Sequence, residues 1–158
     1  MNDLTKTVPK RRITSCALFF NGEHEILIVK PTYRNDNDWL IVGGTVDENE
    51  SPLSGCKREV REELGIDLPV QRLLCVEYQP PQDTRPEGLH FIFYGGVLSE
   101  PQIQVIKLPV DELCEFRFCR YDDALKLISP RLAERVVFAL AALEQQKTIY
   151  LENKVEIE

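Results

Sequence analysis

The segment of residues 43–65 constrains the fold of this chain more than any other stretch. Two consecutive glycines, Gly43-Gly44, end a short apolar run and permit backbone conformations or close approaches that side chains would prevent. A helix is predicted over Ser51–Leu64, because its first residue suits an N-cap and Pro52 suits the first helical position. Gly65 suits the left-handed position just past the helix. These features predict a strand end, a loop and a capped helix in succession.

The predicted helix carries an apolar arc and an acidic arc side by side. At ~100° per residue the apolar arc is the face that packs on a sheet, and it contains Leu53, Cys56, Val60 and Leu64. Glu59, Glu62 and Glu63 stand at i, i+3 and i+4, so their charges converge on one face. The macrodipole disfavours anions in the last turn, and a like-charge i,i+4 pair costs roughly 0.2–0.5 kcal/mol.

A solvated charged face explains an Arg58–Glu62 ion pair, but it does not explain why acids crowd the unfavourable end of the helix. A bound divalent cation explains it. Oxygen-rich sites of this kind suit Mg²⁺, with Mn²⁺ as the alternative, and they are completed by water and substrate phosphates. The sequence therefore predicts a metal-dependent site that binds a phosphorylated small molecule.

These residues resemble the complete 23-residue signature of the Nudix hydrolases, which would span Gly44 to Ile66. Gly44 is followed after five residues by Glu50, and after seven more by the run Arg58-Glu59-Val60-Arg61-Glu62-Glu63-Leu64-Gly65-Ile66. The likeness extends from about Arg12 to Gln145. Val42 stands where family members often carry proline, whereas no acidic residue of the signature is missing.

The resemblance implies an α/β fold, a Nudix-type α/β/α sandwich with a mixed β-sheet and a catalytic loop-helix-loop. Residues 1–158 are expected to form one domain, with flexible tails at 1–11 and 152–158. Apolar patterning places the elements in an order that suits a mixed sheet covered by helices on both faces. Strands are predicted at Ile13–Phe20, Ile26–Lys30, Trp39–Val42, Val70–Tyr78, Leu89–Leu98, Ile103–Lys107 and Glu115–Arg120, and further helices at Tyr121–Ile128 and Arg131–Gln145.

The resemblance also implies an activity, namely hydrolysis of a nucleoside diphosphate linked to a further moiety. Water would attack phosphorus with the help of Mg²⁺. Glu59, Glu62, Glu63 and the Gly43 carbonyl would hold the metal, while Arg58 would orient Glu59 and Glu50 would brace the loop. Glu59 is the first choice of general base, and Glu112 or Glu115 could supply a further ligand or base.

Two other functions compete with catalysis. The first is an inactive Nudix-like module that binds nucleotides as a sensor, and the second is an acidic helix that recruits a protein partner. Two substrate classes also stay open, an ADP-sugar such as ADP-ribose and a (deoxy)nucleoside triphosphate. Pro81 lies 15 residues beyond Ile66, a spacing that resembles the ADP-ribose-directed subgroup. A loop stiffened by Pro80 and Pro81 explains the same residues without a substrate.

Substrate contacts outside the signature are expected from cationic and aromatic residues near the site. Lys30, Arg34 and Arg85 are the candidate phosphate partners, beside the backbone at Gly44. A stacked base contributes roughly 1–3 kcal/mol, and the candidate platforms are Tyr33, Trp39 and Tyr78. Ordinary packing or surface exposure accounts equally well for each of these side chains.

Composition limits the partners and the setting. The 19 Lys+Arg against 26 Asp+Glu give a net charge of −7, which disfavours a sequence-independent grip on nucleic acid. The longest apolar runs fall far short of the ~20 residues that cross a bilayer. Five cysteines without a CxxC pair, and a first apolar run without a cleavage site, favour a reduced cytoplasmic protein. A homodimer is an open expectation from the resemblance to ADP-sugar enzymes.

Overall fold

A computed structural model describes residues 8–34 and 38–158, which form a mixed α/β fold. The strands are β1 Arg12–Phe20, β2 Ile26–Pro31, β3 Val42–Thr45, β4 Leu73–Gln79, β5 Gly88–Val97, β6 Leu113–Cys119, β7 Ile149–Glu152 and β8 Val155–Glu156. The helices are α1 Pro52–Leu64, α2 Glu100–Gln104, α3 Tyr121–Leu127 and α4 Pro130–Glu144. No helix in the described ranges is both long and apolar enough to cross a membrane.

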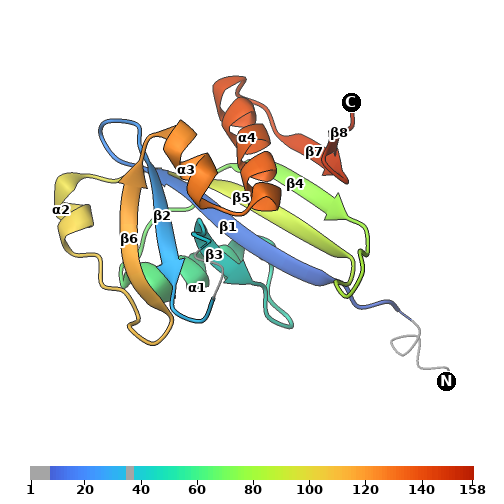
Figure 1. The fold of residues 1–158 in the computed structure, drawn as a ribbon, viewed down its shortest axis with the longest axis horizontal. Coiled ribbons are helices and arrows are strands. Elements are labelled where there is room, and N and C mark those ends of the chain that lie inside the picture. The colour runs from blue at the N-terminus through green and yellow to red at the C-terminus, as the bar shows by residue number, and fades with distance from the viewer. Residues whose placement is uncertain (1–7, 35–37) are drawn as a thin grey trace.

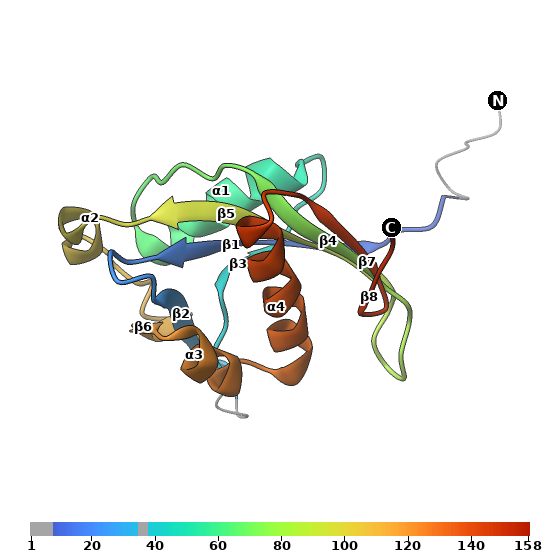
Figure 2. The ribbon, with the colours of Figure 1, turned by 90° about the horizontal axis from the view of Figure 1, so that it is seen from above.

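The strands form one mixed sheet in the order β6-β2-β1-β5-β4-β7-β8, with β3 attached to β1. β1 runs parallel to β5 along its whole length and antiparallel to β2 and β3. Helix α1 covers one face of the sheet, and α3 and α4 cover the opposite face (Figures 1 and 2). The predicted α/β/α sandwich with a mixed sheet is confirmed.

β1 divides one of its edges between two partners. It pairs with β2 only at the hairpin end, where Phe20 faces Ile26. Nearer its start, residues 14–17 of β1 pair with β3, and Cys16 lies opposite Gly43. Because β2 diverges from β1 after the hairpin, β3 fits into the opening and brings its two glycines to the middle of the molecule.

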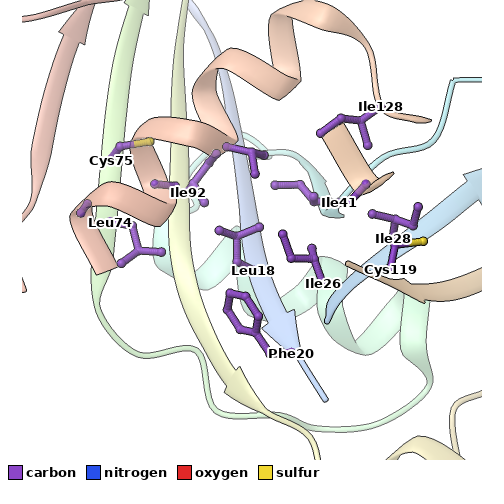
Figure 3. Packing of buried hydrophobic residues seen from close by; sticks show 14 of the residues in the cluster. Leu18, Phe20, Ile26, Ile28, Ile41, Leu74, Cys75, Ile92, Cys119 and Ile128 are labelled. Carbon is purple, nitrogen blue, oxygen red and sulfur yellow. The ribbon is translucent and has the colours of Figure 1, made fainter. Parts of the chain in front are cut away.

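Two apolar cores flank the sheet. The core under α3 and α4 includes Leu18, Ile26, Leu74 and Ile92, contributed by β1, β2, β4 and β5 (Figure 3). The core under α1 contains Ala17 and Phe19 from the other face of β1, together with Cys56, Val60 and Leu64 from the helix. The alternation of residues 17–20 between the cores is the period of two that a strand buried on both faces imposes.

Three sequence-based element predictions are wrong. Ile103–Lys107 is not an edge strand, because α2 occupies Glu100–Gln104 and is started by a capping box in which the Ser99 amide donates to the Gln102 side chain at 2.9 Å. The strand expected at Trp39–Val42 lies further along, at β3. The polar tail expected from 152 onward contains β8, which pairs with β7. Part of the other tail, residues 1–7, lies outside the described residues.

Candidate active site

Helix α1 is held at both ends by the caps that the sequence predicts. The Ser51 hydroxyl accepts a hydrogen bond from the Ser54 amide at 3.1 Å, and Pro52 occupies the first turn. Gly65 adopts φ 70° and donates its amide to the Arg61 carbonyl at 2.9 Å. With its apolar arc buried against the sheet, the helix turns Glu59 and Glu63 toward β3.

Both positions of β3 need glycine, because neighbouring atoms lie where a Cβ would stand. Gly43 has φ 137°, and a Cβ there would stand 2.4 Å from the Ser15 carbonyl oxygen. A Cβ on Gly44 would stand 2.7 Å from the Glu59 carboxylate. The Gly43 amide donates to Glu63 at 2.7 Å. The missing side chains therefore allow two carboxylates of α1 to lie directly against the β3 backbone.

We expect Gly44→Ala to lower kcat/KM about 100-fold, because a displacement of roughly 1 Å in a reacting group can cost that much. The methyl group must push the Glu59 carboxylate aside, while the fold can keep its melting temperature because the obstacle is the end of a side chain. Gly22→Ala is the matched control, since a Cβ there meets nothing within 4 Å. Wild-type kcat/KM in Gly44→Ala would show that the position of Glu59 does not matter.

Arg58 ties the loop after β3 to the helix. Its guanidinium donates to Glu50 twice at 3.0 Å, to Glu59 at 2.9 Å and to Glu62 at 3.1 Å. It also donates to the Thr45 carbonyl at 3.0 Å. The predicted Arg58–Glu59 and Arg58–Glu62 contacts are thus present. The Glu50 side chain accepts the Asp47 amide at 3.0 Å, so the loop is braced at two points.

The carboxylates of the site differ in their electrostatic environment. Glu63 is only 7% exposed, and burial raises its pKa to about 8, assisted by the nearby charges of Glu59, Glu112 and Glu62. Burial also raises the pKa of Glu59, against the stabilising effect of Arg58. The hydrogen bond from Arg58 lowers the pKa of Glu50. The negative charges of Glu59 and Glu63 are thus incompletely compensated by the protein itself.

These two carboxylates open onto a cleft of about 1180 Å³. Five of the residues that the sequence proposes for the site line this cleft: Gly43, Gly44, Arg34, Arg85 and Tyr33. Glu112 also lines it. Arg34 forms an ion pair with Asp38 at 3.4 Å, and Asp38 lines the cleft as well.

Four predicted candidates outside the signature do not line the cleft, and neither do Glu50, Arg58 and Glu62 within it. Trp39 is 4% exposed in the core, with the Arg117 guanidinium 4.8 Å from its ring, so it is not a free stacking platform. Lys30 also lies over the Trp39 ring, at 5.9 Å. Tyr78 donates to Glu87 at 2.9 Å, and Glu115 pairs with Arg117 at 2.8 Å.

The cleft also contains residues that the sequence did not single out. Helix α4 contributes Arg131 and Arg135, although its sequence suggests only a docking face. Arg135 is 8% exposed and donates to buried Glu77 at 2.6 Å. His90 lines the same wall. One sequence feature could have predicted this buried ion pair. Glu77 lies within an apolar strand and Arg135 lies beside the apolar stripe of a helix, so both charges occupy positions that face the core.

The donor set fits a divalent cation. Among residues 8–34 and 38–158, no three His, Cys, Asp or Glu side chains are already gathered in ligand geometry, because Arg58 holds Glu59 and Glu62. Mg²⁺, however, binds through one or two carboxylates and completes its shell with water and phosphate oxygens. Buried Glu63 and partly buried Glu59, both with raised pKa values, offer the carboxylate oxygens for such a site.

The fold and the site agree with one protein family. The family model described as NUDIX domain matches residues 10–140, and the chain belongs to the Nudix family. The resemblance seen in the sequence is therefore confirmed.

Similar proteins extend this assignment. Over 88 residues the chain is 40% identical to the zebrafish (Danio rerio) 8-oxo-dGDP phosphatase NUDT18, a match that covers 52% of this chain and 26% of the relative. The MutT protein of Methanosarcina mazei Go1 has a TM-score of 0.68 at 22% identity, over 90% of this chain and all of that one. The NUDIX domain of Shewanella oneidensis NrtR, solved with ADP ribose, has a TM-score of 0.71 at 18% identity, over 90% and 94%.

Proposed function

We propose that this chain is an Mg²⁺-dependent pyrophosphohydrolase that cleaves the diphosphate bond of a nucleoside diphosphate derivative by attack of water at phosphorus. The observation that carries the proposal is the pair Glu59 and Glu63, held against the glycines of β3 and facing a large cleft. Burying carboxylates costs free energy that their hydrogen bonds offset only in part, and a bound cation would offset the rest.

Each residue of the pair has a distinct role in this proposal. Glu59, Glu63 and the Gly43 carbonyl would hold the Mg²⁺, with Glu62 as a further ligand, and the bound ion would lower the pKa of water and neutralise phosphate oxygens. Glu59 accepts the proton of the attacking water, because Arg58 fixes its carboxylate and burial makes it more basic. Glu50 keeps the loop in place through Arg58. Glu112, which also lines the cleft and whose charge acts on Glu59 and Glu63, is the second candidate base.

The choice of substrate rests on the shape of the cleft and on the relatives. Arg34 and Tyr33 stand near the carboxylates and can bind the diphosphate and an adjoining ring. The partial relative is named for 8-oxo-dGDP, and a protein of the same fold was solved with ADP ribose. The chain spans about a quarter of that relative's length. Both named compounds are nucleoside diphosphates or their derivatives, and we therefore take this class as the substrate.

Five cysteines without disulfides suit a cytoplasmic setting.

A product assay tests the proposal. Purified protein with Mg²⁺ or Mn²⁺ is offered ADP-ribose, UDP-sugars, 8-oxo-dGDP and nucleoside triphosphates, and the products are separated. We expect a nucleoside monophosphate from one class, and no product in the presence of a chelator. AMP with ribose 5-phosphate identifies an ADP-ribose enzyme, and pyrophosphate identifies a triphosphate enzyme. Tight nucleotide binding without turnover of any compound would instead support the sensor module.

A further inference from the structure

The cleft extends well beyond the carboxylates, along strand β1. Cys16, Thr14 and Arg12 all line it, and alternate residues of a strand share one face. Cys16 lies opposite Gly43, while Arg12 lies opposite Gly88 on the neighbouring strand β5. Four residues of extended chain span about 13 Å. The cleft therefore has a far end about 13 Å from the glycine pair, and this far end has its own lining.

The far end is rich in cations although the chain as a whole carries −7. Five cationic side chains line it, with Asp83 as the acidic counterpart among the described residues: Arg12, Arg85, Arg131, Arg135 and Lys154. Lys154 is neutralised by Glu134 at 2.7 Å, and Arg135 by Glu77. In the part of the chain that the structure describes, Arg12, Arg85 and Arg131 form no ion pair, so about three positive charges are left without a carboxylate.

Hydrogen bonds fix the segments that surround the far end. Arg131 donates to the Gln82 side chain at 2.6 Å, which fastens the loop between β4 and β5 to the start of α4. Glu77 is 3% exposed, and it accepts from Arg135 at 2.6 Å and from the Lys154 amide at 2.9 Å. Three separate segments are thereby locked around the cationic end.

One buried ring nitrogen at the same place has no partner among the described residues. The Nε2 atom of His90 is buried without a hydrogen-bond partner, whereas the Nη2 atom of Arg135 lies 2.6 Å from the Glu77 carboxylate. The other ring nitrogen of His90 lies 2.6 Å from the Thr14 hydroxyl. Thr14, His90 and Glu77 occupy one row across β1, β5 and β4, and Arg135 reaches that row from α4. A buried polar group without a partner is unfavourable, and such a group is expected where a ligand completes it.

From this arrangement we propose that the far end of the cleft is a second anion subsite, which binds a phosphate or carboxylate carried by the moiety beyond the diphosphate. Arg131 and Arg12 are its principal cations, and Arg85 on the loop closes it. The proposal rests on the proposed function, since it takes the diphosphate to lie at the glutamate end. It makes the substrate a compound with two anionic parts separated by about 13 Å of cleft.

Matched ligand pairs test the subsite. UDP-glucuronate is compared with UDP-glucose for a carboxylate, and ADP-ribose 1″-phosphate, which carries the phosphate on the terminal ribose, is compared with ADP-ribose for a phosphate. Dissociation constants are measured calorimetrically in EDTA at low salt, and kcat/KM with Mg²⁺. We expect the anionic member of one pair to bind about tenfold more tightly, because one charge-assisted contact is worth that much. The pair that shows the preference identifies the anion, and added salt should weaken it.

The variant Arg12→Gln/Arg131→Gln is expected to reduce this preference to about twofold, while binding of the member that lacks the extra anionic group changes little. Arg61→Gln is the control, because Arg61 is 61% exposed and paired with Asp67 on the outer side of α1. Equal binding of both members in both pairs would overturn the subsite, as would a preference that survives in the double variant. Preference in EDTA without turnover in Mg²⁺ would keep the subsite and reject the proposed hydrolysis, so the two failures are distinguishable.

Discussion

Replacement of Glu59 by glutamine is expected to lower kcat about 1000-fold, because the side chain loses both its basicity and its affinity for a cation. The substitution keeps shape and volume, and the Arg58 hydrogen bond to Glu59 at 2.9 Å can be made to the amide oxygen. KM is expected to change only a few fold, since the loss falls on the chemical step. Steady-state kinetics on the best substrate of the product assay measures both constants.

Glu144→Gln serves as the matched control for this experiment. Glu144 ends α4, is exposed and forms no ion pair in the part of the chain that the structure covers, so its kinetics should equal those of the wild type. Folding is checked by the melting temperature. A Glu59→Gln enzyme that keeps more than about a tenth of wild-type kcat is incompatible with Glu59 as the base, and would direct attention to Glu112.

Replacement of Glu63 by glutamine is expected to stabilise the metal-free protein at pH 8.5 by on the order of 2–4 kcal/mol. The pKa of Glu63 is 4.5 in a free side chain and is raised to about 8 by burial in the folded state. As pH rises from 4.5, the unfolded chain releases this proton while the folded chain retains it. The free energy of unfolding of the wild type therefore falls until the folded pKa is passed, whereas glutamine has no proton to lose.

Chemical denaturation in EDTA at pH 5 and at pH 8.5 measures this difference. The advantage of Glu63→Gln should be small at pH 5, where the wild-type carboxyl is protonated in the folded state. Mg²⁺ should raise the melting temperature of the wild type more at pH 8.5 than at pH 6, because a ligand must be deprotonated to bind metal. Glu63→Gln should lose most of this response. If Glu63→Gln is no more stable than the wild type at pH 8.5, the pKa of Glu63 is not raised by burial in the folded protein.

Much of the site could be predicted because it depends on local sequence. The caps of α1, the i, i+3 and i+4 spacing of the glutamates and the glycine pair are separated by few residues, so their geometry follows from helix and loop rules. The contact of Arg58 with Glu59 and Glu62 lies within one helix turn. The family signature has the same local character, and its match was confirmed.

The parts that could not be predicted depend on pairing between distant segments. Trp39 was a candidate for base stacking, but the pairing of β2 with β6 places Arg117 on its ring and buries it. Arg131 enters the cleft because α4 lies across the sheet, 49 residues from its partner Gln82. The short strand β8 pairs with β7, and β7 in turn pairs in parallel with the distant strand β4. Residue spacing alone contains no information on such contacts.

The most direct test of the account is hydrolysis in ¹⁸O-labelled water with Mg²⁺, followed by mass spectrometry of the two products. The account predicts one ¹⁸O atom in a phosphate group of a single product, no reaction in EDTA, and loss of the labelled product in Glu59→Gln. A label found outside the phosphate groups would contradict attack of water at phosphorus. Undiminished turnover in EDTA would contradict the metal-dependent role of the carboxylates on α1.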